Sequence, residues 1–188
     1  MLAFLLFLPI SLRDAMQGNV FHYAGDYNSQ SMLFWQYANE FVKSGGTFSW
    51  VTELGSGFIN SYSYYMLGSP FFGVSLWVPA KWMPWAMVPI FCFKFAVAGA
   101  GGYLWSKRWV KNPQYAMLAG MLYAFCGYNI YSIFYDSFID VTALFPYMLA
   151  ALDDAIIDNK KTRFPIWVAL FIVWNFFVAA KAFSAFAA

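Results

Sequence analysis

The chain of 188 residues has few charged side chains, and this deficit excludes most classes of soluble protein. Asp, Glu, Lys and Arg together make up 11% of the sequence, against about 25% in ordinary soluble domains. Apolar residues make up 62% and aromatic residues 23%. A soluble fold of this size would have too little polar surface to cover such a core. The composition therefore predicts an integral membrane protein, and the net charge of +2 is too small to indicate nucleic acid as a partner.

Chemically reactive residues are also scarce. The two cysteines, Cys92 and Cys126, lie in apolar runs without the spacing of a disulfide framework or a metal site, so we expect packing residues. The single histidine, His22, has no Ser or Cys in a recognisable catalytic arrangement, and we expect an interfacial polar residue. No glycine-rich phosphate loop is present, which argues against direct use of ATP or a nucleotide sugar. The opening MLAFLLFLPI lacks a basic region and a small-residue cleavage site, so we expect no cleaved signal peptide.

Long apolar runs mark the predicted membrane spans, because a helix needs about 20 apolar residues to cross a bilayer. We therefore expect an all-α fold, a polytopic bundle of transmembrane helices. The run at 1–11 is too short to cross alone and is interpreted as the outer part of a first span. The segment 61–78 is rich in Tyr and Gly, and we favour a re-entrant or interfacial segment over a full span. The predicted segments are a partial span at 1–11, an outer loop at 12–84, and spans at 85–105, 116–134, 137–157 and 164–188.

Two clusters of basic residues predict how the chain is oriented. One cluster lies at 107–111 and the other at 160–163, two spans later. Both loops therefore lie on the same side, which the positive-inside rule identifies as the cytoplasm. The loop 12–84 and the tight connection around Asp136 are then expected on the extracytoplasmic side.

The first outer loop contains an amphipathic pattern. In SQSMLFWQYANEFVKSGG, apolar residues recur at helical spacing and polar residues occupy the other face. The pattern predicts a helix capped by Asn28 or Ser29 and ended by Gly45–Gly46. A helix of this kind between two membrane segments lies most simply in the membrane interface. A helix that only packs against the bundle fits the pattern equally well.

Outer carboxylates and one deep lysine are the candidate functional residues. The acidic positions expected outside are Asp26, Glu53, Asp136 and Asp140. Asp140 lies at the start of a span, where charged groups are costly and usually paired, and Asp136 shares its helical face if the helix extends that far back. Lys94 lies nine residues after Trp85, roughly 14 Å along a helix, which is too deep for its stem to reach the interface easily. A carboxylate or a bound phosphate could supply its counter-charge, and a purely structural ion pair with Asp140 or Asp136 also fits.

Six short motifs occur in a characteristic order. They are GDYNSQ (25–30), FSWVTELGSGF (48–58), YYMLGSPF (64–71), FKFAVAGAGGYLW (93–105), LYAFCGY (122–128) and DVTALFP (140–146). Together, over residues 21–152, they resemble the N-terminal part of the YfhO family, bacterial multi-pass membrane proteins of the GT-C glycosyltransferase class. Family members are several times longer, so we expect the chain to correspond to the N-terminal part of a GT-C-like transmembrane domain.

The resemblance implies an enzyme of the bacterial cytoplasmic membrane with its active site outside. It would take a sugar from a polyprenyl-phosphate carrier to an acceptor, often an envelope polymer such as lipoteichoic acid. In GT-C enzymes an acidic residue in the first outer loop is the catalytic carboxylate, and Asp26 occupies that position. Lys94 and Asp140 match a lysine and an acidic residue of the family. The candidate substrate-binding residues are Lys94, Asp140, Asp136, Gln30 and Glu53.

Other functions remain open at this point. A transporter or flippase for a lipid or envelope-polymer precursor also fits a lysine and aspartates inside spans, but it needs no large structured outer loop with an acidic residue. A non-catalytic membrane scaffold leaves Lys94 unexplained. Carboxylates on a phosphate-handling face suit Mg²⁺ or Mn²⁺, although no ligand set can be assembled from the sequence. The expected partners of the leading hypothesis are the lipid bilayer, the lipid-linked sugar and the polymer acceptor.

Overall fold

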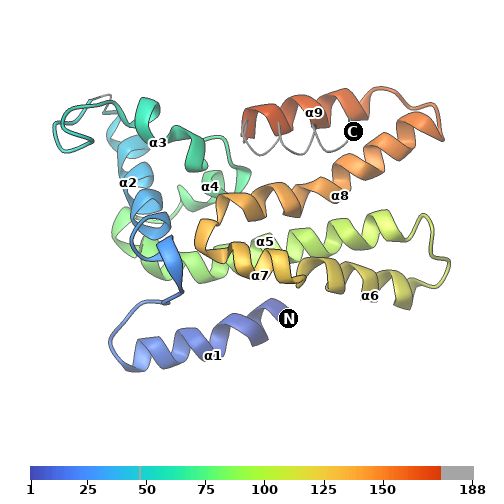
Figure 1. Ribbon diagram of the computed structural model, residues 1–188, viewed down its shortest axis with the longest axis horizontal. Helices are drawn as coiled ribbons and strands as arrows, with labels where there is room; N and C mark the ends of the chain where they lie inside the picture. Colours follow the sequence, from blue (N-terminus) through green and yellow to red (C-terminus); the bar gives the residue numbers. More distant parts are fainter. Residues whose placement is uncertain (47, 175–188) are drawn as a thin grey trace. The chain divides into compact units, whose positions relative to one another are not determined.

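The computed structural model describes residues 1–46 and 48–174, and these residues form helices without a β-strand. They divide into two compact units. The first unit contains Met1–Cys92 and Phe134–Ser137, and the second contains Phe93–Ile133 and the described residues from Phe138 onward. The predicted all-α class is confirmed for the described part of the chain. The elements labelled in Figure 1, with the short 3₁₀ helices η1–η3, are α1 (Leu2–Met16), η1 (Gly25–Tyr27), α2 (Ser31–Ser44), α3 (Phe58–Met66), α4 (Pro70–Ser75), η2 (Ala80–Trp82), α5 (Met83–Ser106), α6 (Pro113–Ala124), α7 (Gly127–Tyr131), η3 (Ser132–Tyr135), α8 (Ser137–Ile156) and α9 (Arg163–Trp174).

Aromatic rings form the core of the first unit. Phe7 of α1 stacks on Phe91 of α5 with ring centroids 5.6 Å apart. Phe21 meets Phe7 and Tyr27 edge to face, and all four rings are buried. Stacked and edge-to-face ring pairs stabilise a core beyond the burial of their area. The cluster therefore anchors the beginning of the first connecting loop to two helices.

Helix α1 extends beyond the predicted partial span at 1–11 and ends at Met16. Most of its leucines are exposed, as expected for side chains that contact lipid. Near its end, buried Asp14 accepts hydrogen bonds from the Arg13 guanidinium at 2.8 Å and from the His22 backbone N–H at 2.9 Å. The bond from Arg13, reinforced by the bond from His22, lowers the pKa of Asp14 below its ordinary value. The hydrogen bonds of Asp14 thus stabilise the turn that follows α1.

The amphipathic helix predicted in the first loop is present as α2, but it begins differently. Its N-cap is Gln30, and no side chain caps it. The predicted cap at Asn28 or Ser29 is therefore wrong. The Asn28 side chain is used in the preceding loop, where it accepts a hydrogen bond from the Tyr23 N–H at 3.0 Å and donates one to the Phe21 carbonyl.

The end of α2 follows the prediction. Gly45 adopts a left-handed backbone with φ 67° and closes the helix, a conformation that glycine accepts without steric cost. Trp35, Ala38 and Asn39 are buried, and α2 packs against α3, η2 and η1. The position of α2 in a membrane interface stays a prediction.

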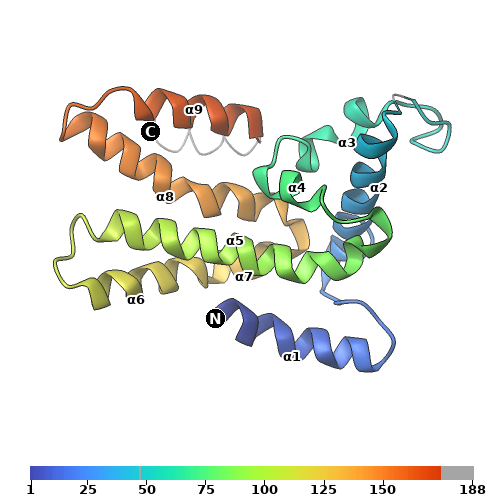
Figure 2. The same ribbon diagram turned by 180° about the vertical axis from the view of Figure 1, so that it is seen from behind.

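The ambiguous segment 61–78 contains two short helices rather than one long one. Helix α3 ends at Met66 and α4 begins at Pro70, and Figure 2 shows them as two separate short helices. Ser69 separates them, since its hydroxyl oxygen accepts the backbone N–H groups of Phe71 and Phe72 and caps α4. Neither helix is long enough to cross a bilayer. Whether the segment re-enters the membrane or lies on it stays a prediction.

Glycines let two helices of the second unit approach closely. In Figures 1 and 2, α6 runs antiparallel beside the C-terminal part of α5. A Cβ added to Gly102 would lie 3.1 Å from the Cα of Gly120, and one added to Gly120 would lie 2.8 Å from the backbone N of Tyr103. Small residues at such contacts are the usual basis of helix association within membranes. The glycine-rich motif of 93–105 is thus a packing surface.

A polar network interrupts the next predicted span. Helix α6 ends at Ala124 and α7 starts at Gly127. Buried Asn129 donates to the carbonyls of Tyr123 at 3.1 Å and Ala124 at 3.0 Å, and it accepts the Thr142 hydroxyl at 2.7 Å. Backbone groups in an apolar medium need such partners. The backbone carbonyls at this break are therefore hydrogen-bonded. The apolar composition of the run gave no sign of the break.

The two basic loops meet at one end of the second unit. Arg108 pairs with Asp154, and with Asp158 at 3.2 Å, while Arg163 also reaches Asp154 at 3.2 Å. The hydrogen bond to Asp154 is the main cause that raises the pKa of Arg108 above its ordinary value. Both loops therefore share a side, as the orientation argument requires. That this side faces the cytoplasm stays a prediction.

By length and composition, two helical stretches of the described chain could cross a membrane. They are Ala80–Ser106 and Pro113–Tyr135, which correspond to the predicted spans 85–105 and 116–134. Helix α8 has 20 residues but carries three aspartates, and α9 has 12 described residues. The remainder of the predicted span 164–188 lies outside the described residues from position 175. A full polytopic bundle stays a prediction.

Candidate functional site

Asp26 lies in η1, between the aromatic core of the first unit and the start of α2. Its carbonyl accepts the N–H of Gln30 at 2.8 Å, so the backbone passes directly from Asp26 into the helix. The preceding Gly25 has φ 69°, and a Cβ there would lie 3.3 Å from the Phe134 ring. Glycine is required at this position for both reasons. The local fold therefore holds Asp26 in one place relative to α2.

The carboxylate of Asp26 is half-buried and has a neutral hydrogen-bond donor. The Tyr135 hydroxyl donates to its Oδ2 at 2.6 Å. A neutral phenol orients a carboxylate without cancelling its charge. One carboxylate oxygen is thus held by a hydrogen bond to a side chain 109 positions later in the chain.

The segment Phe134–Ser137 reaches the first loop through backbone as well as side-chain contacts. The Ser31 hydroxyl at the start of α2 donates to the Phe134 carbonyl at 2.8 Å. Asp136, in the same segment, is buried. Two connections predicted on one side of the membrane, the loop 12–84 and the turn at Asp136, therefore contact each other in the first unit.

A second phenol, that of Tyr27, lies near Asp136. Tyr27 is fully buried, and its hydroxyl oxygen has no hydrogen-bond partner among the described residues. Burial raises the pKa of Tyr27 well above its usual range, and the negative charge of Asp136 raises that pKa further. Tyr27 therefore stays a neutral phenol.

Lys94 and Asp140 form a buried ion pair in the second unit. Their Nζ and Oδ1 atoms are 2.6 Å apart, and the lysine side chain has no exposed surface. The pair joins α5 to α8. A buried charge is stable only when it is matched in this way. This geometry agrees with the structural interpretation of Lys94, and a phosphate could reach its ammonium group only after Asp140 moves away.

The remaining candidates are less constrained. Asp136 does not share a helix with Asp140, because η3 ends at Tyr135 and α8 starts at Ser137. Gln30 is the N-cap residue of α2 and is partly exposed. Glu53 lies at the tip of a loop, is exposed, and makes no ion pair or hydrogen bond with another described residue. The described residues contain no group of three His, Cys, Asp or Glu side chains that could hold a metal ion.

Sequence reasoning missed Tyr135, which touches the principal candidate directly. Its position in FYDSFID, next to Asp136, was a usable signal, because the turn had already been expected on the same side as Asp26. Asn129 and Thr142 were also missed. A lone Asn in an apolar run is a sign of a helix interruption, since its amide must find partners inside the membrane.

These features describe a helical protein with two stretches that could cross a membrane, in which the Asp26–Tyr135 hydrogen bond joins the first loop to a later turn. A family model described as "Bacterial membrane protein YfhO" matches residues 1–179. The chain therefore belongs to the YfhO family of bacterial membrane proteins, as its motifs predicted. No curated protein and no solved structure matches the chain.

Proposed function

We propose that this YfhO-family protein is a membrane glycosyltransferase that takes a sugar from a polyprenyl-phosphate donor to an extracytoplasmic envelope polymer such as lipoteichoic acid. The observation that carries this proposal is the Asp26–Tyr135 contact of 2.6 Å. It gives an incompletely buried carboxylate a fixed direction, which a general base requires. The GT-C resemblance of the motifs supports the same assignment.

In the proposed reaction Asp26 removes the proton from an acceptor hydroxyl. The hydroxyl oxygen attacks the anomeric carbon of the donor sugar, a carbon–oxygen bond forms, and the bond between that carbon and the phosphate oxygen breaks. The electron pair of the broken bond leaves with the polyprenyl phosphate. One base suffices for such an inverting displacement. Tyr135 acts as a positioning residue, because its hydrogen bond occupies one carboxylate oxygen and leaves the other available for the acceptor.

The leaving phosphate needs positive charge or a metal ion. Lys94 stays our candidate for that charge, in a state in which its contact with Asp140 is exchanged for phosphate. The described residues do not assemble a ligand set for Mg²⁺ or Mn²⁺. We place the reaction on the extracytoplasmic face of a multi-pass protein, in line with the basic loops.

The test replaces Asp26 with Asn in the full-length protein. We expect the sugar content of the envelope polymer to fall by about 10²–10⁴-fold, the usual contribution of a general base, while insertion and thermal stability are kept. Asp158→Asn, an equally conservative change in the second unit, serves as the matched control. Normal glycosylation by the Asp26→Asn variant would show that Asp26 is not the base.

A transporter or flippase for a lipid or envelope-polymer precursor is the second candidate, and one observation favours it. The helix break between α6 and α7 and the ion pair joining α5 to α8 both occur in the second unit. Interrupted helices and intramembrane charges are typical of transport sites. A transporter would continue to move its lipid-linked cargo in reconstituted vesicles when Asp26 is Asn, whereas the enzyme would leave its donor unconsumed.

A further inference from the structure

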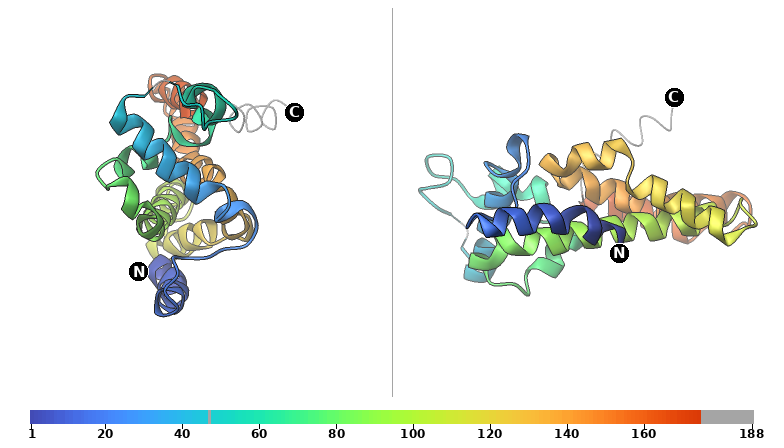
Figure 3. Two further views of the ribbon diagram at one scale, coloured as in Figure 1. Left: turned by 90° about the vertical axis from the view of Figure 1, so that its left-hand side faces the viewer. Right: turned by 90° about the horizontal axis from the view of Figure 1, so that it is seen from below.

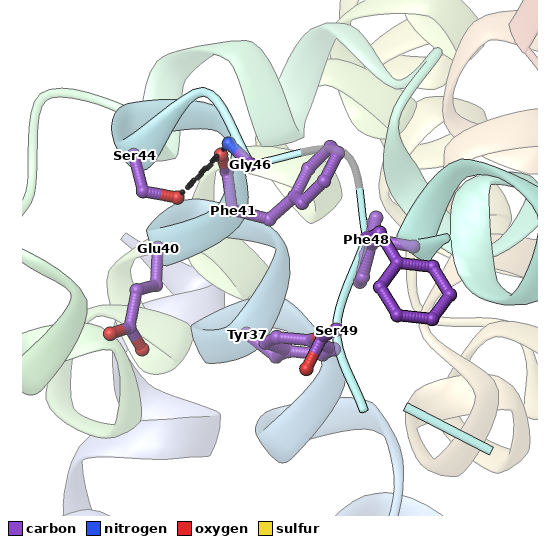
Figure 4. Close-up of a pocket in the computed structure, with 8 residues that line it drawn as sticks. Tyr37, Glu40, Phe41, Ser44, Gly46, Phe48 and Ser49 are labelled. Carbon is purple, nitrogen blue, oxygen red and sulfur yellow. Dashed lines mark hydrogen bonds between the residues drawn. The ribbon is translucent and has the colours of Figure 1, made fainter. Parts of the chain in front are cut away.

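One pocket of the first unit has an aromatic wall but no charged group directed at that wall. It has a volume of about 160 Å³, and Tyr37, Phe41 and Phe58 are among the residues that line it. In Figure 4 the carboxylate of Glu40 points away from the rings of Tyr37 and Phe41. Aromatic walls accept many apolar groups, so this pocket identifies no class of ligand. A pocket of the second unit differs in this respect, because a cation lies against its wall.

The pocket of the second unit lies between the end of α5 and the beginning of α6. It has a volume of about 300 Å³ and is lined by Tyr103 of α5 and by Pro113, Gln114 and Met117 of α6. Figure 3 shows the loop that joins the two helices at one end of the unit. Both helices belong to stretches that could cross a membrane. In a bilayer crossed by these two stretches, the pocket lies at the level of the lipid headgroups.

Lys107 brings a positive charge to this pocket. Its ammonium group lies 5.7 Å from the centre of the Tyr103 ring, which forms the α5 wall. The attraction between an ammonium group and a tyrosine ring does not neutralise the cation. Neither Lys107 nor Lys111, an exposed lysine of the same loop, makes an ion pair with a described carboxylate. The charge of both lysines is therefore available to an anion.

The carboxylates nearest to this loop already have other partners. Arg108 pairs with Asp154, and with Asp158 at 3.2 Å. The Trp105 indole N–H donates to Asp153 at 3.0 Å, and the Arg108 Nε lies 4.0 Å from the same carboxylate. These contacts direct the acidic end of α8 toward Arg108 and away from the two lysines. An anion at the pocket thus meets unmatched positive charge.

The surface that continues from the pocket favours a lipid over a free anion. Met117 lines the pocket and is exposed, and Leu118 and Leu122, further along α6, are exposed as well. They lie between the pocket and the middle of the predicted span 116–134. An acyl chain can cover an apolar surface of this kind while its headgroup stays beside the lysine. A free phosphate would leave the same surface uncovered.

We infer that the pocket between α5 and α6 binds the anionic headgroup of a membrane phospholipid, with Lys107 beside the Tyr103 wall as counter-charge and an acyl chain along α6. Basic pockets at the ends of transmembrane helices bind headgroups through this combination of charge and apolar contact. The bound lipid would join the ends of two predicted spans. The inference does not depend on the proposed function, because neither Asp26 nor Tyr135 takes part in it.

The test localises a lipid on the full-length protein. The protein is placed in phosphatidylcholine nanodiscs with a trace of phosphatidylglycerol that carries a photoreactive diazirine on its acyl chain, and labelled residues are identified by peptide mass spectrometry. We expect labelling within residues 113–122. Unlabelled phosphatidylglycerol should displace the label about 5-fold more effectively than phosphatidylethanolamine, the factor expected for one lysine facing a net negative charge.

Variants separate this pocket from general surface charge. Lys107→Gln should remove the 5-fold preference, whereas Lys107→Arg should retain it. Lys161→Gln is the matched control, since Lys161 is an exposed lysine of the other basic loop without an ion pair to a described residue, and it should behave as the wild type does. Gln114→Glu places a carboxylate in the pocket with little change of shape and should also weaken labelling. Melting curves of each variant confirm that it is folded.

Four results would overturn the inference. Labelling absent from residues 113–122 would show that no lipid occupies the pocket. Equal displacement by the two competing phospholipids would show that the headgroup charge is not recognised. Displacement by glycerol phosphate as effective as that by phosphatidylglycerol would assign the site to a free anion. Equal losses in Lys107→Gln and Lys161→Gln would attribute binding to the charge of the whole surface.

Discussion

Asp26 and Asp140 are both aspartates near predicted spans, but their burial and their hydrogen-bond partners differ between the two units. In the first unit, Asp26 is half-buried and accepts a hydrogen bond from a neutral phenol. In the second unit, Asp140 is buried against the ammonium group of Lys94 at 2.6 Å. Asp26 thus has a neutral donor as its partner, whereas Asp140 has a positively charged one. The surroundings of a carboxylate, rather than its presence near a span, distinguish a candidate base from a structural charge.

The cores of the two units also differ in the kind of contact that holds them. The first unit is held by aromatic contacts such as Phe7 with Phe91, which tolerate a polar site at their edge. The second unit places polar groups inside, where Asn129 and Lys94 are both at most 1% exposed. Loss of one member of a buried polar pair leaves its partner unsatisfied, so substitutions should cost more stability in the second unit.

The largest expected effect on stability is at the ion pair. Lys94→Met leaves Asp140 buried without a counter-charge and should lower the free energy of unfolding by about 3–5 kcal/mol. The double variant Lys94→Met/Asp140→Leu should recover most of that loss, because an apolar pair needs no matching charge. Chemical unfolding of the purified full-length protein in detergent measures both. A single variant that keeps wild-type stability and sugar transfer would remove Lys94 from both the structural and the phosphate-binding roles.

The next effect concerns the helix break of the second unit. Asn129→Ala removes the donor for two backbone carbonyls, and each unpaired buried group costs about 1–3 kcal/mol. Asn112→Ala is the matched control, since its side chain caps the exposed start of α6 through Gln114, a contact worth about 1 kcal/mol. Thermal unfolding of the two variants should show the larger decrease for Asn129→Ala. Equal decreases would mean that the break needs no side-chain support.

The third prediction tests the orientation of Asp26 in the first unit. Tyr135→Phe deletes one hydroxyl and should reduce the rate of sugar transfer by about 10- to 150-fold, since a hydrogen bond to a charged group contributes about 1.5–3 kcal/mol. A positioning role predicts a lower kcat with an unchanged KM for the donor. Tyr128→Phe, at an exposed tyrosine, should leave both constants unaltered. A loss confined to KM would indicate that Tyr135 binds substrate and does not orient the base.

The smallest effect is expected at Asp14. Its pKa is lowered in the folded protein, so its contribution to stability is present above the ordinary value of 3.8 and is lost as the pH falls through the lowered pKa. Asp14→Asn should therefore reduce the Tm slightly near neutral pH and less at pH 3. Melting curves of both proteins at the two pH values give the difference. A larger deficit at pH 3 than at pH 7 would contradict the assignment.

How far the sequence predicts this structure depends on the kind of signal. Apolar runs placed α5 and the stretch containing α6, because burial of long apolar segments dominates their energetics. The amphipathic period and Gly45 placed α2. The cap at Asn28 failed because its side chain forms longer-range loop contacts that a local rule cannot include. The break after Ala124 was missed because its cause, the bond between Thr142 and Asn129, joins separate elements.

The candidate site shows the same limit. The pairing of Lys94 with Asp140 was among the expected alternatives, since a deep charge needs a partner. The Asp26–Tyr135 contact was not, because it joins residues 109 positions apart and the tyrosine is one of 13. Local patterns predict which groups need partners, while only the assembled fold identifies the partners themselves.

The membership of Phe134–Ser137 in the first unit also determines when the site can be completed during synthesis. The ribosome adds about 5–20 residues per second, so Tyr135 follows Asp26 after roughly 5–20 seconds. Throughout that interval the aspartate has been synthesised and its phenol does not yet exist. The hydrogen bond between them must therefore form late, and a nascent protein halted before Tyr135 is added would carry the Asp26 carboxylate without this donor.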